Sequence, residues 1–425
     1  MSALSIINAR IIDPASGYDG IGNVTVEDGV ITGFGPALTP IGEIIDAQGH
    51  ICAPGLIDMR VSTGEPGREN RETIATAARA AAAGGVTSIV LTPETNPVID
   101  DMSLVDFLQR RAEAAPCNVY LAGALTKGLD GTSLTEIGLM SEMGAVMFSN
   151  GANPISDSQT MRRLLSYAAN FNALIANRPR DISLSKDAVA HESDLSSRMG
   201  LIGAPAAAER IMAERDIALA ELTGGRLLID MISSAEALDV VSRAKSRDLD
   251  VSCSVSVNHL ALNELDIGDY RTFAKLDPPL REESDRLALL KGVNEGAIDV
   301  IVSSHDPRPA GEKRLPFSEA STGAVGLETL LSAVLTQVAN GQLGLITALA
   351  AMTCNPANIL GLPSGRIAKD APADLTLIDL NAPWLCESAD LRSRSKNTPF
   401  DGRRMTGRAI ATICRGELVY DGRGI

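Results

Sequence analysis

Several side chains that could do chemistry follow the ends of short apolar runs. Arg60 and Ser62 come directly after the run that ends at Met59, Arg178 follows a shorter run, and Ser304 and His305 follow another. Zinc is bound by Cys, His, Asp or Glu, whereas an arginine keeps its proton and a lone serine hydroxyl is a poor ligand. These residue types therefore indicate a polar pocket that lacks the usual ligands of a zinc ion.

The four histidines of the chain leave two other chemistries open. A makeshift one-metal site could use His259 and His305 with nearby acids, although no pair of them has the spacing that places two side chains on one metal. Metal-free catalysis could use His305 as a general base. His50 and His191 lie before a strand and in a polar loop, so we expect them at the surface. The acids considered for these sites are Glu94, Asp230, Asp277 and Asp306, and the serines are Ser62, Ser303 and Ser304, none of which lies in a nucleophile turn.

The composition excludes several classes of function. The 425 residues carry a net charge of −15, which disfavours nucleic acids and anionic membranes as partners, and only 3% are aromatic. No apolar run is long enough to span a membrane, and we see no signal peptide. The six cysteines have no close pairs, so we expect reduced, buried thiols in a cytoplasmic protein.

Strand-like apolar runs alternate with helical patterns between the two ends of the chain, which is typical of a parallel α/β sheet. Eight such units predict a (β/α)8 TIM barrel, whose active sites lie at the carboxyl ends of the strands. Both chain ends read as short antiparallel strands that are too few to bury a face alone, so we expect them to form one composite β-sandwich. The predicted domains are residues 1–50 plus 365–425 for the sandwich and 51–364 for the barrel. The predicted barrel strands are Ile51–Met59, Thr87–Thr92, Asn118–Ala124, Ala145–Ser149, Ala173–Ala176, Arg226–Ile232, Asp250–Val255 and Asp299–Ser304. The predicted helices are Arg71–Ala83, Pro205–Thr223, Ala235–Ser246, Glu283–Glu295 and Leu327–Asn340.

Short motifs spread over nearly the whole chain follow one order and spacing. They are Pro54-Gly55-Leu56-Ile57-Asp58, Glu65-Pro66-Gly67, Thr95-Asn96-Pro97, Lys275-Leu276-Asp277-Pro278-Pro279-Leu280-Arg281 and Asn355-Pro356-Ala357. Together they resemble the dihydroorotases of the amidohydrolase superfamily, in which a pair of zinc ions lies at the barrel mouth.

The positions that do chemistry in that family differ here. Where the resemblance places metal-binding and catalytic side chains, the chain carries Arg60, Ser62, Asn150, Arg178, Met231, Ser304 and His305. At or beside the substrate positions it carries Gly64, Glu94, His259 and Asp277. We therefore expect a vestigial pocket with no catalytic, substrate-binding or metal-binding residue and no cofactor.

Two arginines could replace part of the charge that the zinc pair supplies in the family. We expect Arg60 and Arg178 to pair with Asp58, Asp230, Asp181 or Glu94, unless either side chain points to solvent. The resemblance implies a non-catalytic homologue in pyrimidine biosynthesis that assembles or stabilises aspartate transcarbamoylase, and a homodimer is expected. Two alternatives stay open: an active dihydroorotase or other cyclic-amide hydrolase with an altered site, and an anion-binding sensor.

Overall fold

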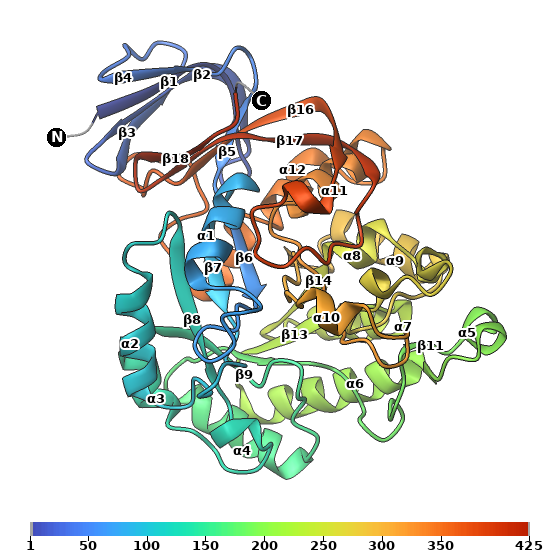
Figure 1. Ribbon diagram of the computed structural model, residues 1–425. Coiled ribbons are helices and arrows are strands. Elements are labelled where there is room, and N and C mark those ends of the chain that lie inside the picture. Colours follow the sequence, from blue (N-terminus) through green and yellow to red (C-terminus); the bar gives the residue numbers. More distant parts are fainter. Residues whose placement is uncertain (1–2, 424–425) are drawn as a thin grey trace.

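The predicted parallel strands form an eight-stranded sheet that curls into a nearly closed barrel in the computed structural model, which describes residues 3–423. The two edge strands, β6 and β15, meet through a bridge between Val61 and His305, and the amide of Ser62 donates to the carbonyl of His305 at 2.8 Å. The predicted TIM barrel is therefore confirmed (Figure 1). In sheet order the barrel strands are β6 Leu56–Val61, β7 Val86–Leu91, β8 Asn118–Ala124, β9 Ala145–Ser149, β10 Ile175–Asn177, β13 Leu227–Ile232, β14 Val251–Ser256 and β15 Val300–Val302.

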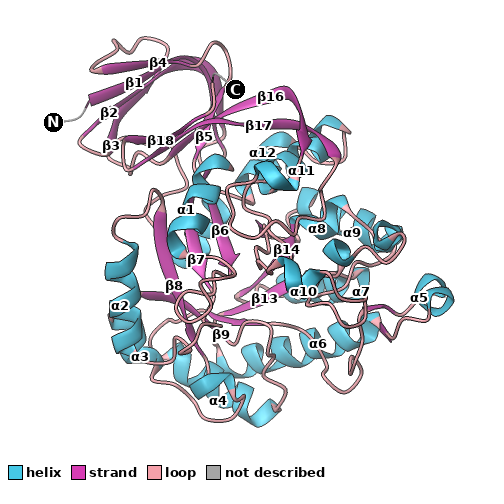
Figure 2. Ribbon diagram, viewed as in Figure 1, coloured by secondary structure: helices cyan, strands magenta, loops and turns pink. Residues whose placement is uncertain are grey.

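Strands from both ends of the chain join as expected, and they form one mixed sheet that lies beside the amino-terminal end of the barrel (Figure 2). It pairs strands that are more than 300 residues apart in sequence. Its order is β18 Glu417–Asp421, β17 Arg403–Cys414, β16 Leu375–Cys386, β5 Ile51–Pro54, β1 Ala3–Asp13, β2 Tyr18–Glu27 and β3 Val30–Gly35, with β4 Glu43–Asp46 beside β1.

The run predicted as one strand, Ile51–Met59, divides between the two sheets. Residues 51–54 form β5 in the mixed sheet, and the first barrel strand, β6, starts at Leu56. Gly55 lies at the crossing, where a Cβ atom would come within 2.1 Å of the Thr87 hydroxyl. The prediction of a single strand was wrong because an apolar run gives no sign of a change of sheet when both halves are buried.

Helices cover the outside of the barrel, and their ends follow local capping chemistry. Helix α1 begins at Ile74 instead of Arg71 because the Thr73 hydroxyl accepts from the amide of Thr76 in a capping box. Helix α6 ends at Gly224, which has a φ of 67°. The helices are α1 Ile74–Ala83, α2 Met102–Ala112, α3 Ile137–Glu142, α4 Ser158–Ala169, α5 Asp194–Met199, α6 Ala206–Thr223, α7 Ala235–Lys245, α8 Val257–Ala261, α9 Glu283–Asn294, α10 Ala310–Lys313, α11 Leu330–Ala339, α12 Leu345–Ala350 and α13 Cys354–Leu360.

Apolar side chains fill the barrel, so it is a packed core and not a channel. Met59, Met147, Leu228 and Met231 meet inside it, and a larger cluster lies between the strands and the helices. No helix within residues 3–423 has the length and apolar character needed to cross a membrane.

Candidate functional site

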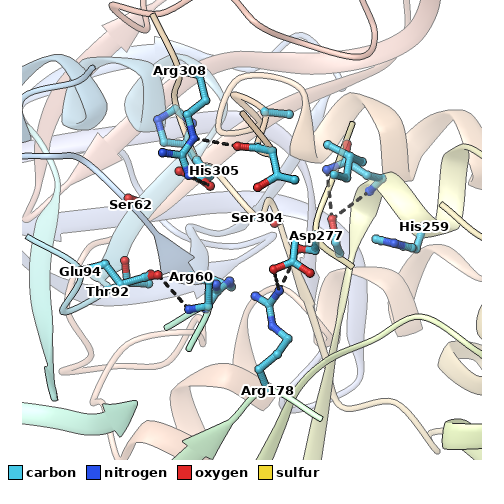
Figure 3. A pocket seen from close by; sticks show the side chains of 18 residues that line it. Arg60, Ser62, Thr92, Glu94, Arg178, His259, Asp277, Ser304, His305 and Arg308 are labelled. Atoms are coloured by element: carbon cyan, nitrogen blue, oxygen red, sulfur yellow. Dashed lines mark hydrogen bonds and ion pairs between the residues drawn. The ribbon is translucent and has the colours of Figure 1, made fainter. Parts of the chain in front are cut away.

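The barrel mouth holds a small, partly open cavity lined by side chains from the carboxyl ends of the strands. Arg60 belongs to β6, Arg178 comes directly after β10, and Ser304 comes two residues after β15. Figure 3 shows these side chains together with Ser62, Glu94 and others around the same space. The cavity measures about 40 Å³, which is room for about three water molecules.

Arg60 forms a direct ion pair across the mouth. Its Nη1 lies 2.7 Å from Oδ2 of Asp230, and the side chains are only 12% and 7% exposed. Burial acts to lower the pKa of Arg60, but the carboxylates of Asp230 and Glu94 outweigh it and the net shift is upward. Of the partners expected for Arg60, Asp230 is the one that binds it. The Asp58 carboxylate instead accepts the backbone amide of Arg60 at 3.2 Å.

Arg178 is almost completely buried and pairs with a second acid. Its Nη1 lies 3.1 Å from Oδ2 of Asp277 and donates to the Asp277 carbonyl at 2.9 Å. Arg180 reaches the same carboxylate at 3.1 Å. Burial acts to raise the pKa of Asp277, but these arginines hold it below its usual range. Asp181, another expected partner, instead caps its own turn by accepting from Ser183 and Leu184.

The two pairs form one charge network. Oδ2 of Asp230 lies 3.9 Å from Nη2 of Arg178, so this carboxylate stands between both guanidinium groups. Neither arginine points to solvent, and each is held by a carboxylate from another strand or loop. The network therefore ties the ends of β6, β10 and β13 to the loop that carries Asp277.

His305 is fully buried and faces the carboxylate of Glu72. Its Nδ1 accepts the amide of Gly326 at 3.1 Å, so the ring proton is on Nε2, which lies 3.6 Å from Oε2 of Glu72. Ser393 donates its hydroxyl to that same oxygen, and the amide of Arg394 also donates to Glu72. The acids expected to orient His305, Asp230 and Asp306, make no hydrogen bond to it among the described residues.

The remaining altered positions serve the local backbone. The Asn150 side-chain oxygen accepts the amides of Leu125 and Thr126 at 3.1 Å. Glu94 accepts the amide of Ala152 at 2.8 Å. Gly64 has a φ of 98°, and a Cβ there would lie 2.6 Å from the Arg68 carbonyl oxygen. None of these contacts leaves a side chain poised toward a substrate.

Two of the altered positions keep a strained backbone. Met231 and Ser304 have φ values of 59° and 53°, in the left-handed region that non-glycine residues rarely adopt. Such strain persists where the surrounding structure imposes it, and it is commonest at ligand-binding and catalytic sites. The side chain of Met231 packs into the barrel core.

The other histidines differ from the expectation in one case. His191 is buried and not at the surface, because its Nδ1 accepts from Nη1 of Arg281 at 2.9 Å inside the polar cluster that also holds Glu209. His259 lines the cavity, and burial lowers its pKa to about 4. Its Nε2 lies 3.2 Å from the Pro279 carbonyl.

The residues at the mouth do not fit a zinc pair. Within residues 3–423 no three His, Cys, Asp or Glu side chains lie close enough together to hold a metal ion. The two acids nearest the centre, Asp230 and Asp277, are already bound by guanidinium groups that cannot act as ligands. The makeshift site suggested by the sequence is therefore not assembled.

Sequence reasoning missed two contributors to this region, Glu72 and Ser393, and it expected Asp58 only as a partner of the arginines. Asp58 is buried below the mouth, where burial raises its pKa to about 6 and its Oδ2 has no hydrogen-bond partner within the described chain. Glu72 and Ser393 are 321 residues apart. A buried acid in an apolar strand was a visible signal for Asp58, but no local pattern links Glu72 to Ser393.

Comparisons with known proteins agree with this architecture. A family model described as dihydro-orotase-like matches residues 49–237. Dihydroorotases of Pelobacter propionicus and Ehrlichia canis are 41% and 39% identical, over 98% of this chain and 99% and 95% of theirs. Among solved structures, the L-hydantoinase (dihydropyrimidinase) of Arthrobacter aurescens superposes with a TM-score of 0.90 at 23% identity, covering 99% of this chain and 97% of that one. A D-hydantoinase (dihydropyrimidinase) from Thermus sp. gives 0.85 at 22% identity, over 99% of this chain and 95% of that one. The structural matches show the fold, and the full-length relatives show that the chain belongs to the dihydroorotase-like family of amidohydrolases.

Proposed function

We propose that this chain is a non-catalytic dihydroorotase homologue that serves pyrimidine biosynthesis as a structural subunit of aspartate transcarbamoylase. The observation that carries the proposal is the ion pair between Arg60 and Asp230, which fills the barrel mouth with charges that bind each other. A guanidinium group cannot bind a metal or exchange a proton near neutral pH. The pocket is thus occupied by groups that stabilise the fold and offer no hydrolytic chemistry.

The orientation of His305 supports the same proposal. Its Nδ1 lone pair is used by the amide of Gly326, and its Nε2 carries the ring proton toward Glu72. A general base needs a free lone pair within reach of the proton that it removes. His305 therefore has no basic nitrogen available to activate water.

Full-length relatives named dihydroorotase support the assignment to pyrimidine biosynthesis. The partnership with aspartate transcarbamoylase rests on the resemblance to non-catalytic homologues that accompany that enzyme, and a homodimer is part of the proposal. The six cysteines are buried and unpaired, which suits a chain that works in the reducing cytoplasm.

The first test is metal content and activity in parallel. The purified chain is incubated with excess zinc and desalted, its metal is measured, and ring closure of carbamoyl aspartate and ring opening of dihydroorotate are assayed. The Pelobacter propionicus dihydroorotase provides the matched control. We expect no retained zinc and no turnover from this chain. Tightly held zinc together with turnover would support the rival, an active cyclic-amide hydrolase.

The second test is assembly. The chain is mixed with the aspartate transcarbamoylase catalytic chain of the same organism, and the mass of the complex is measured by light scattering during gel filtration. We expect a larger species that contains both chains, and a transcarbamoylase that resists heat better in the complex than alone. Separate elution at micromolar concentrations, with no change in transcarbamoylase stability, would refute the structural role.

A further inference from the structure

One edge of the buried Arg178 guanidinium has no partner. The side chain is 2% exposed, and Nη1 makes the contacts to Asp277. Nε and Nη2 make no hydrogen bond to any described residue. Buried donors are almost always satisfied, and leaving a charged one unsatisfied costs more than leaving a neutral one. This edge therefore calls for an acceptor that the chain itself does not supply.

A second orphan donor borders the same cavity. The hydroxyl of Thr92 is buried without a hydrogen-bond partner, and Thr92 and Arg178 both line the space at the barrel mouth. Ser62 and Ser304 line it as well, and Figure 3 shows the Arg178 guanidinium beside Asp277. The wall is thus rich in donors, and the space is small.

The carboxylates nearest this space are already engaged. Asp230 is held by Arg60, Asp277 by Arg178 and Arg180, and Asp306 by Arg308. Glu94, which also lines the cavity, accepts the amide of Ala152. Asp230 lies 3.9 Å from Nη2 of Arg178, which is too far for a hydrogen bond. Burial, and next the charge of Arg60, lower the pKa of Arg178, whose Nε and Nη2 have no acceptor within the described chain.

We propose that the Nε–Nη2 edge of Arg178, with the Thr92 hydroxyl, binds a small oxyanion: a carboxylate, bicarbonate or phosphate group. The two parallel N–H bonds of this edge match two oxygens of one such group, which is the bidentate geometry in which arginine binds oxyanions most strongly. A halide accepts at a single point and gains nothing from the fork. The volume of about three waters is enough for an ion of four or five heavy atoms.

The test is stabilisation by specific ions at constant ionic strength. Thermal unfolding of the intact chain is followed in sodium phosphate, bicarbonate or acetate, with sodium chloride making up the ionic strength, and affinities are taken from calorimetric titration. We expect a saturable rise in unfolding temperature with at least one oxyanion over chloride, as selective binding to the folded state requires. The tightest of the three identifies the source as a phosphate or a carboxylate-type group. Equal stability in all four salts would mean that the cavity holds only water, and the proposal would be overturned.

Two variants and one control assign the effect to this site. Arg178→Lys keeps the charge but removes the fork, and should weaken binding about tenfold. Thr92→Val removes an unpartnered hydroxyl without changing the shape of the side chain, so it should fold well and weaken binding about fivefold. Arg180→Lys is the matched control, because Arg180 shares Asp277 but does not line the cavity. Unchanged affinity in Thr92→Val and in any folded Arg178→Lys would refute the assignment.

Discussion

Replacing Arg60 with methionine should destabilise the chain, because Asp230 would keep a buried charge and lose its nearest partner. At an effective dielectric near 20, two unit charges about 4 Å apart attract by about 4 kcal/mol. Removal of one partner of a buried pair costs about 3–5 kcal/mol. Arg178, whose Nη2 lies 3.9 Å from the same carboxylate, would compensate in part. The expected loss is therefore at the lower end, about 3 kcal/mol.

The assay is a double-mutant cycle with Arg60→Met, Asp230→Asn and the double variant, followed by urea unfolding and circular dichroism. If the pair acts as the structure indicates, the double variant should lose about 2 kcal/mol less stability than the summed losses of the two single variants. The coupling should survive 0.5 M salt because screening acts mainly on exposed charges.

An exposed pair serves as the control. Arg110 and Asp106 lie 2.5 Å apart on α2 with side chains 72% and 35% exposed. Their coupling should be about 0.3–0.5 kcal/mol and should fade with salt. A coupling between Arg60 and Asp230 no larger than this control would refute the view that the arginine takes over a structural role at the mouth.

Three further changes test other parts of the fold. Because burial raises the pKa of Asp58 to about 6, its carboxyl favours folding below about pH 4, and this contribution is lost as the pH rises through 6. The free energy of unfolding of Asp58→Asn should therefore rise by about 3 kcal/mol relative to that of the native chain between pH 4 and pH 8, as measured by urea unfolding. A stability difference between the two proteins that does not change with pH would contradict this. Ser393→Ala removes a hydrogen-bond donor from buried Glu72 and should lower the free energy of unfolding by about 2 kcal/mol. Ser393→Thr keeps the hydroxyl and should lower it by less. Equal losses in the two variants would show that the hydroxyl is unimportant. Gly55→Ala should lower the unfolding temperature because its Cβ would overlap Thr87, at a cost of about 1–3 kcal/mol of stability. Gly311→Ala is the control and should be neutral, because a Cβ there meets nothing within 4 Å. Similar unfolding temperatures for the two variants would argue against a tight crossing at Gly55.

The sequence by itself determined the barrel and the residue types at its mouth. Alternating apolar runs and helical patterns are local signals, and two predicted strands, Asn118–Ala124 and Ala145–Ser149, have the bounds that the structure gives them. The residue types at Arg60 and Arg178 were visible directly, and carboxylate partners for both could be expected from charge balance alone.

Only the tertiary structure decided which carboxylate each arginine binds. Asp230 is 170 residues from Arg60, and Asp277 is 99 residues from Arg178. Such pairings depend on how closed the barrel is and on where each strand ends. The sequence pattern gives strand ends only to within a few residues, and it does not give the closure of the barrel. The same holds for His191, whose polar loop is folded back onto Arg281. Local patterns determine which elements form, whereas burial and long-range pairing determine what their side chains meet.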